Sequence, residues 1–463
     1  MATEDKKLKH LLIRAGFGAT PAFLSRFRGK DVAIVADELI KDSAIIQDLL
    51  YLEKPETKDN GEVGPLKVVA LFIKSQKQKE ALNFAWIDRM SVAKAQLREK
   101  MILFWHNHFA TSGNMAYLLQ VQHNTIRKHA LGSFRDLLHE MSRDPAMILW
   151  LNNQQNKKDA PNENFAREVM ELFTLGEGNG YKENDIKNAA RAFTGWAVNK
   201  KGEFEFRDKQ HDFEEKEVFG KKGNFNGENI IDMLLEKPQL SEYICRKIYK
   251  TFVNAEVDEA RVIELAARFR SNDYDISDLM RTIFVSEWFY DDKNIGCIII
   301  SPVELIVRLK KLCRLELDDD QMGALQQVLG QTLFIPPNVA GWKGGRGWID
   351  TSSLVQRLHL PKAMLDAGTA RLNRKPAFEE TTDDKQQDDK TAKVKSDWTM
   401  LTEYFSRFDD AALTDEVIKF LILAPSDRID KKQIENTIDI SSKQRRIITT
   451  VVAVMQTPEF QII

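Results

Sequence analysis

The stretch that decides the fold class runs from Leu97 to His108 and reads LREKMILFWHNH. Large apolar side chains recur in it every three or four residues, at Leu97, Met101, Phe104 and Trp105, and His108 continues the series. This spacing places them along one stripe of an α-helix and predicts that the stripe is buried.

The same periodicity continues along most of the chain, whereas strand signals are sparse. An alternating pattern at Glu203–Phe206 and again at Val218 and Phe219 predicts one small β-hairpin near 203–220. The sequence therefore predicts a mainly α fold, a large multi-helix globular protein. Helices are expected from about 65 to 108 and near 115–131, 162–175, 183–194, 227–253, 257–287, 301–314, 350–367, 408–424 and 443–457.

Residues 374–397 interrupt the helical pattern, because Asp, Lys, Gln and Thr dominate there and apolar side chains are almost absent. Such a segment buries too little surface to offset the entropy lost on ordering, so we expect a mobile loop. The amphipathic residues 398–463 are expected to pack back as terminal helices. The whole chain, 1–463, is thus expected to form a single helical domain.

The composition excludes several classes of protein. Of the 463 residues, 67 are basic and 69 acidic, so a net charge of -2 provides no long-range attraction to nucleic acid or to an anionic membrane. Cys245, Cys297 and Cys313 are too widely spaced for a zinc knuckle or a disulfide framework. We expect three small buried side chains instead.

Targeting signals are not visible either. No stretch reaches the roughly 18 apolar residues of a membrane span, and the charged N-terminus does not look like an export signal. The sequence as written predicts a cytoplasmic protein without a membrane span, or an exported one if a signal peptide is missing from this chain. It leaves the oligomeric state open.

The segment PNENFAREVMELFTLG, residues 161–176, carries the most informative group of polar side chains. Asn164, Glu168 and Glu171 share one flank of a helix, and Glu168 lies nearest the apolar stripe, so it should be half-buried. Two carboxylates and an amide can bind a cation or hold a proton. Arg167 lies one turn from Glu171, so ordinary ion pairs are the alternative interpretation.

Three histidines are further candidates. His106 and His108 point about 200° apart on a helix, so they are not expected to bind one ion together. His108 lies on the apolar stripe, where a hydrogen-bonded core histidine is the alternative to a ligand role. His211 and Asp212 lie in a polar loop, where functional side chains are common, although one such pair is a weak signal.

A glycine-rich loop, PPNVAGWKGGRGWID at 336–350, contains Trp342 and Trp348. Its indoles could stack on a sugar or a ring of a ligand, or they could fill a gap between helices. The sequence lacks an HExxH motif, an ExxH pair, a GxSxG motif and a phosphate loop.

An ordered set of motifs that covers most of the chain resembles a bacterial family catalogued as domain of unknown function number eighteen hundred. The resemblance implies a mainly helical fold with no agreed catalytic residues. It also implies that relatives are often exported and that many are encoded beside a companion sulfatase-like protein. The motifs are HLLIRAGFGATP (10–21), FWHNHFATS (104–112), ALGSFRDLL (130–138), DPAM (144–147), NENFAREVMELFTLG (162–176), ARAFTGW (190–196), HDFEEKEVFG (211–220) and PPNVAGWKGGRGWID (336–350).

Two functional hypotheses follow. The first is a metal-dependent enzyme or a metal-assisted binder of a small ligand, which requires the candidate side chains to converge within a few ångströms. The second is a non-catalytic binding partner or scaffold for the companion sulfatase-like protein, with an exposed apolar patch near Trp342 and Trp348. The first hypothesis assigns His108, Glu168, His211 and Asp212 as ligands or proton carriers, His108, Glu168 and His211 as ligands of a divalent metal ion, and Asn164 and Arg167 as orienting residues.

Overall fold

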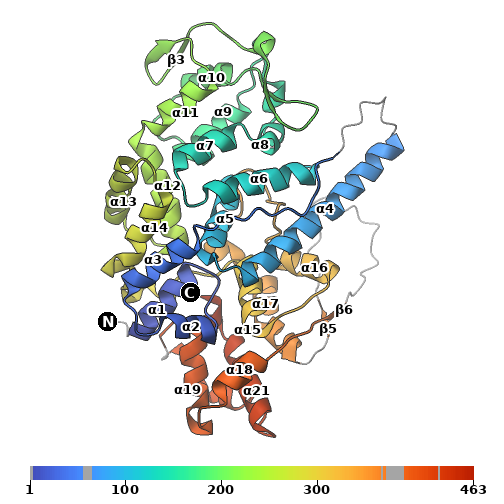
Figure 1. The fold of residues 1–463 in the computed structure, drawn as a ribbon, viewed down its shortest axis with the longest axis vertical. Coiled ribbons are helices and arrows are strands. Elements are labelled where there is room, and N and C mark those ends of the chain that lie inside the picture. Colours follow the sequence, from blue (N-terminus) through green and yellow to red (C-terminus); the bar gives the residue numbers. More distant parts are fainter. Residues whose placement is uncertain (1–3, 56–64, 366–368, 372–390, 426–427) are drawn as a thin grey trace.

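The computed structural model describes residues 4–55, 65–365, 369–371, 391–425 and 428–463. It is mainly α-helical, as the periodicity predicted, and its few strands are short (Figure 1). The helices are α1 Glu4–Arg14, α2 Pro21–Phe27, α3 Val32–Asp42, α4 Pro65–Val92, α5 Gln96–His108, α6 Ala116–His129, α7 Phe134–Ser142, α8 Pro145–Trp150, α9 Asn164–Glu168, α10 Glu183–Ala192, α11 Gly227–Leu235, α12 Pro238–Phe252, α13 Glu259–Ser271, α14 Ile276–Val285, α15 Pro302–Cys313, α16 Asp319–Leu329, α17 Thr351–Leu365, α18 Thr399–Phe405, α19 Asp410–Leu421, α20 Lys431–Glu435 and α21 Lys443–Met455. The strands are β1 Trp196–Val198, β2 Phe204–Phe206, β3 Lys216–Val218, β4 Lys221–Gly223, β5 Thr369–Arg371 and β6 Thr391–Lys393.

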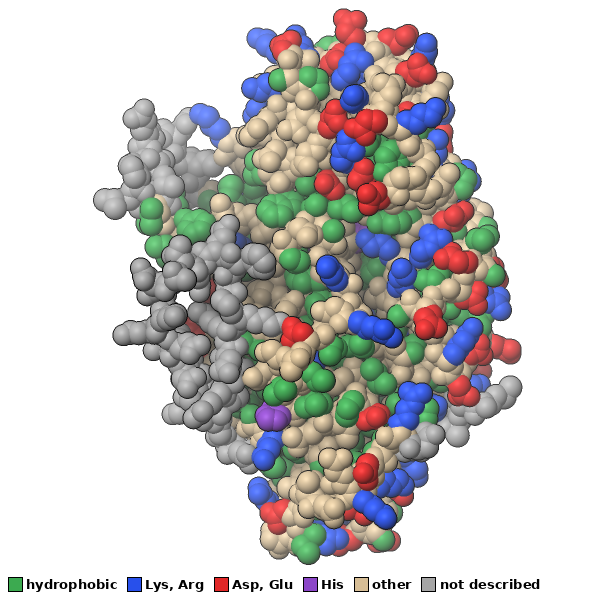
Figure 2. Space-filling model, turned by 180° about the vertical axis from the view of Figure 1, so that it is seen from behind, with side chains coloured by type: hydrophobic (Ala, Val, Ile, Leu, Met, Phe, Trp, Pro, Cys, Tyr) green, Lys and Arg blue, Asp and Glu red, His purple; other side chains and the backbone are tan. Residues whose placement is uncertain are grey.

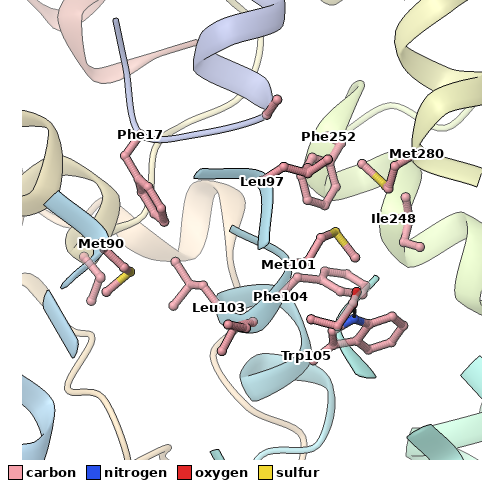
Figure 3. Packing of buried hydrophobic residues seen from close by; sticks show 14 of the residues in the cluster. Phe17, Met90, Leu97, Met101, Leu103, Phe104, Trp105, Ile248, Phe252 and Met280 are labelled. Carbon is pink, nitrogen blue, oxygen red and sulfur yellow. Dashed lines mark hydrogen bonds between the residues drawn. The ribbon is translucent and has the colours of Figure 1, made fainter. Parts of the chain in front are cut away.

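Helix α5 lies at the centre of the packing, and its predicted apolar stripe is buried. Figure 3 shows this stripe among side chains of other helices, including Phe252 of α12, whose ring centroid is 6.1 Å from that of Phe104. The indole Nε1 of Trp105 donates a hydrogen bond to the carbonyl oxygen of Ala130 at 3.0 Å. All of α5 except Asn107 is buried, so its polar side chains also need partners inside the protein.

Two long helices of the sequence prediction are each divided in the structure. Residues 227–253 form α11 and α12, because Pro238 cannot continue a helix and instead occupies the first turn of α12. Residues 257–287 form α13 and α14, separated by Asp273 and Tyr274, which both have positive φ. Such a break depends on one or two residues, so a prediction from the apolar periodicity of the whole segment does not detect it.

The predicted β-hairpin is wrong in its pairing. Strand β2 pairs antiparallel with β1, with Ala197 opposite Glu205, and β3 pairs with β4, with Glu217 opposite Lys222. Each strand therefore pairs with its nearest neighbour in the chain across a short turn, and two hairpins stand where one was expected. His211 lies in the connection between them.

The predicted loop at 374–397 ends earlier than expected. Residues 374–390 lie outside the described ranges, whereas β6 pairs with β5 and the chain after it is ordered. The backbones of Lys395 and Glu316 exchange two hydrogen bonds of 3.0 and 3.1 Å, and Val394 is buried. Val394 and the backbone pairing of Lys395 therefore attach the end of the predicted loop to the rest of the protein. The amino-acid composition did not distinguish these residues from the rest of 374–397.

The terminal residues 398–463 pack against the rest of the chain (Figure 1). Helix α21 contacts α17, α18 and α19, and α18 also contacts α15. One hydrophobic cluster contains buried residues from Leu8 to Ile463. None of the helices in the described ranges is both long and apolar enough to cross a membrane.

Candidate functional site

A cavity of about 1220 Å³ lies between α5, α12, the start of α15 and the tryptophan loop 336–350. This exceeds the space that a drug-sized ligand needs. Aromatic side chains of Phe104, Tyr249, Trp342 and Trp348 contribute to its walls. The cavity therefore offers flat apolar surfaces against which a ring could pack.

The polar lining of the cavity is predominantly basic. Six Lys or Arg side chains line it, against three acidic ones, Glu256, Asp258 and Glu304. Glu304 forms an ion pair with Lys100, and Asp258 lies 3.8 Å from the Nζ atom of Lys293. Lys and Arg side chains are also frequent across the middle of the face shown in Figure 2. Four lining cations have no carboxylate partner in the described part of the chain: Lys247, Lys250, Lys343 and Arg346.

Three consecutive polar residues end α5 and point into different surroundings. The Nε2 atom of His106 lies 3.0 Å from Nδ1 of His123, whose Nε2 lies 3.1 Å from the Arg127 guanidinium. Arg127 in turn pairs with the buried carboxylate of Glu99. His106 thus belongs to a buried polar network, whereas Asn107 and His108 line the cavity.

Asn107 holds the tryptophan loop against α5. Its Oδ1 atom accepts from the Trp342 backbone N–H at 2.7 Å, and its Nδ2 donates to the Trp342 carbonyl oxygen at 3.3 Å. Gly341 makes this approach possible, because its φ is +77° and a Cβ there would lie 2.3 Å from Asn107 Oδ1. These two hydrogen bonds hold Trp342 against α5, where it forms part of the cavity wall.

His108 is held in one tautomer by its two neighbours. Its Nε2 lies 3.1 Å from the carbonyl oxygen of Phe173, which only accepts, so Nε2 carries the proton. Its Nδ1 then accepts from the Nζ atom of Lys247 at 2.9 Å. Burial first, and then the charge of Lys247, hold the pKa of His108 well below its usual range, so the imidazole stays neutral.

The acceptor for His108 is supplied by a π-helix, Val169–Thr174, that directly follows α9. The carbonyl groups in its last turn have no helical donor, as at any helix end. Phe173 therefore accepts from His108, and the Leu172 carbonyl accepts from the Tyr243 hydroxyl at 3.1 Å. Gly176, with φ +90°, lets the Tyr243 ring approach, because a Cβ there would lie 3.1 Å from it. Short π-helical segments often occur at functional sites.

Lys247 joins this arrangement to the cavity. The ammonium group lies 5.3 Å from the centre of the Tyr243 ring and contacts His108. Burial lowers the pKa of Lys247 to about 8, because the surroundings disfavour the charged form and no carboxylate compensates for the lost water. A larger fraction of this amine is therefore neutral than of an ordinary lysine at the same pH, although the ammonium form still predominates at pH 7.

The charged side chains of 161–176 form ion pairs around Arg167. Glu168 is half-buried, as expected, and burial raises its pKa, followed by the charge of Glu171. Arg167 pairs with Glu171 and with other carboxylates, and Asn164 donates to the Leu151 carbonyl oxygen at 3.0 Å. None of these side chains lines the cavity.

His211 and Asp212 lie by the two hairpins at one end of the molecule, away from α5 (Figure 1). The Nδ1 atom of His211 donates to the Thr194 carbonyl oxygen at 2.8 Å, and Asp212 forms an ion pair of 2.7 Å with Arg191. Lys216 donates to the Asp212 carbonyl oxygen at 2.6 Å. These contacts connect the hairpins to α10.

The candidate residues therefore do not converge. Within the described ranges, no three His, Cys, Asp or Glu side chains form a group suited to holding a metal ion. His108 bonds Phe173 and Lys247, His211 bonds Thr194, and the charges that act on Glu168 are those of Glu171 and Arg167. The expected exposed patch is also absent, since Trp342 and Trp348 are only 7% and 8% exposed.

Sequence reasoning missed two residues that the cavity brings together with His108. Asn107 lies between two histidines, which are the more usual candidates for a functional role. Its partner Trp342 is 235 residues away in the chain. Lys247 lies one turn after Tyr243 on α12, next to the buried positions Ile244 and Ile248. The position of Lys247 beside an apolar stripe indicates that it could be partly buried. It does not indicate that its partner is His108, 139 residues away in the chain.

Fold and site together define a mainly α-helical protein with a large basic, aromatic-lined cavity. The chain belongs to the family described as "Protein of unknown function (DUF1800)", whose profile matches residues 10–462 and confirms the resemblance of the motifs. Neither a curated protein nor a solved structure matches the chain.

Proposed function

We propose that the cavity binds a small ligand that combines an anionic group with a flat ring, and that Lys247 pairs with the anion. The observation that carries this proposal is a cavity-lining ammonium group whose partner is a neutral imidazole instead of a carboxylate. A ligand carboxylate, phosphate or sulfate would supply the missing counter-charge.

The surroundings of Lys247 support an anionic ligand. An ion pair is stronger in a cavity with a low effective dielectric constant than in water. The unpaired cations Lys250, Lys343 and Arg346 would attract an anion toward the same cavity. Trp342 and Trp348 line the cavity and, with 7% and 8% of their surfaces exposed, supply a small apolar area for the remainder of the ligand.

We find no support for the metal-dependent alternative among the described residues, because His108 bonds Lys247 and the Phe173 backbone and no three His, Cys, Asp or Glu side chains there are grouped to hold a metal ion. A scaffold role toward a companion sulfatase-like protein remains a prediction of the resemblance. Its proposed docking patch at Trp342 and Trp348 is buried, so another surface would be required. Co-elution of the two purified proteins on size-exclusion chromatography would test that role, and separate elution would count against it.

A thermal melt with phosphate, sulfate, citrate and aromatic carboxylates tests the proposal. A ligand present at about 100 times its Kd stabilises the folded state by about 2.7 kcal/mol, which raises the Tm measurably. We expect at least one anion to raise the Tm of the wild type and to have a much smaller effect on Lys247→Met. Lys187→Met, at an exposed position on α10, is the matched control and should behave as wild type. Equal shifts in all three proteins would refute the assignment.

A further inference from the structure

The contacts of Lys247 differ from those of a lysine that only binds an anion. Its Nζ atom donates to Nδ1 of His108, whose lone pair faces the amine because Nε2 carries the proton. A proton acceptor therefore lies 2.9 Å from the amine, inside the cavity lining. No carboxylate in the described part of the chain holds Lys247 in its charged form.

The other lysines of the cavity lack this arrangement. Lys100 pairs with Glu304, and Lys293 lies near Asp258. Lys250 and Lys343 are exposed to water, which stabilises the ammonium form. Lys247 alone among these five is bonded to a neutral imidazole in a mostly buried position.

We propose that Lys247 is a nucleophile that forms an imine with the carbonyl group of the bound ligand, and that His108 transfers the proton in this step. The substrate class is then an aldehyde or a 2-oxo acid that carries an anionic group. This inference rests on the proposed function, since the cavity must first admit such a ligand.

The step balances without an oxidant or a metal. The ammonium group first loses a proton to water, and the neutral Nζ amine then attacks the carbonyl carbon. A C–N bond forms, and the carbonyl electron pair moves to the oxygen, which takes up a proton from water. His108 Nδ1 accepts one of the two protons that remain on nitrogen and returns it to the hydroxyl group, which departs as water, so that the C=N product is a protonated imine with one N–H left. The Phe173 carbonyl keeps His108 in the tautomer that can accept this proton. His108 touches the reacting amine directly, and Tyr243, whose ring packs beside both, is a positioning residue.

Reductive trapping with glyoxylate tests the inference on the full chain. The protein is incubated with glyoxylate and cyanoborohydride at pH 8, and adducts at each lysine are quantified by peptide mass spectrometry. An ordinary lysine is only about 0.3% neutral at this pH, whereas burial lowers the pKa of Lys247 to about 8. We expect Lys247 to be trapped at least about tenfold faster than Lys250 and Lys343, which serve as internal controls.

Two variants separate the chemistry from folding and from binding. Lys247→Arg should lose the fast adduct, because a guanidinium group does not form the imine, whereas Lys187→Met should keep both the adduct and the Tm gain with phosphate. In His108→Gln, the amide can still donate to the Phe173 carbonyl oxygen, so the fold and the phosphate shift should persist while trapping slows about tenfold.

Trapping that follows exposure, with Lys247 slowest, would overturn the inference. If phosphate still raised the Tm in that case, anion binding would stand and only the imine step would fail. If neither trapping at Lys247 nor any anion-dependent Tm shift occurred, both proposals would fail. Equal trapping rates in the wild type and His108→Gln would overturn the role assigned to His108.

Discussion

At the scale of single residues, His106, Asn107 and His108 show how one short sequence serves three purposes. Helical geometry correctly separated the two histidines, since His106 bonds His123 and His108 bonds Lys247. Their partners could not be predicted, because they come from other helices that only the tertiary fold brings near. No sequence pattern singles out Asn107 as a cavity residue, because its role comes from its hydrogen bonds to Trp342 in a distant loop.

Removing the Asn107 side chain tests its hold on the tryptophan loop. Asn107→Ala loses both hydrogen bonds to Trp342 and leaves backbone groups of that residue without their partner. We expect a loss of about 1–3 kcal/mol in the free energy of unfolding in urea, together with weaker anion binding. Asn184→Ala, at an exposed position on α10, is the control and should change neither. Wild-type binding by Asn107→Ala would contradict the role of this residue.

The buried histidines predict a loss of stability in acid. Burial is the main cause that lowers the pKa of His10, His106, His108 and His123, and the pKa of His106 falls to about 3. In the unfolded chain each of these histidines binds a proton near pH 6.5, whereas in the folded protein it stays neutral. Each one therefore lowers the free energy of unfolding as the pH falls below 6.5. The loss is about 1.4 kcal/mol per pH unit for each histidine. Asp144 opposes it, because burial raises its pKa to about 7 and its protonation favours the folded state in acid.

Urea unfolding between pH 7 and pH 5 measures this slope. His106→Gln removes one proton-binding site and retains a side chain that can bond His123. We expect its slope between pH 6 and pH 5 to be smaller than that of the wild type by about 1.4 kcal/mol per pH unit. An unchanged slope would show that His106 does not stay neutral in the folded protein.

At the scale of elements, the sequence predicted a mainly helical chain, but the expected ranges omitted α3, α7, α8 and α16. Periodicity identified α10 and α15 closely, but it ran α4 into α5, merged α11 with α12 and did not anticipate a π-helix after α9. A π-helix has the same apolar spacing signal as an α-helix over a few residues, so periodicity cannot distinguish them. It is this segment that supplies the acceptor of His108.

Substitutions at two glycines after the π-helix distinguish the cost of backbone strain from the cost of a side-chain contact. Gly176 and Gly178 both have positive φ, but only Gly176 has an atom within 4 Å of a Cβ position, namely Tyr243 at 3.1 Å. Gly178→Ala should therefore cost about 1 kcal/mol of stability, and Gly176→Ala more, because Tyr243 must also move. Thermal unfolding measures both, and equal costs would show that the Tyr243 contact is unimportant.

At the scale of the whole molecule, the sequence predicted one helical domain with terminal helices that pack back. In the structure α18 contacts α15, α21 contacts α17, and one hydrophobic cluster contains buried residues from Leu8 to Ile463. What composition could not provide was the place of the cavity, since its walls come from residues 100 to 348 of the chain. Its lining depends on how distant helices meet.

A shared core predicts cooperative unfolding. We expect one thermal transition, with the same midpoint by circular dichroism and by tryptophan fluorescence, because the terminal helices and the central helices share buried contacts. Two separated transitions would show that residues 398–463 form a unit of their own.

The central claim is that Lys247 binds an anion in the cavity, and a comparison of two matched probes tests it most directly. The Kd values of naphthalene-2-carboxylate and of its neutral carboxamide are measured by fluorescence titration for the wild type and Lys247→Met. We predict that the substitution weakens binding of the carboxylate at least about tenfold, or about 1.4 kcal/mol, and leaves binding of the carboxamide unchanged. Equal weakening of both probes, or carboxylate binding that does not depend on Lys247, would contradict the account.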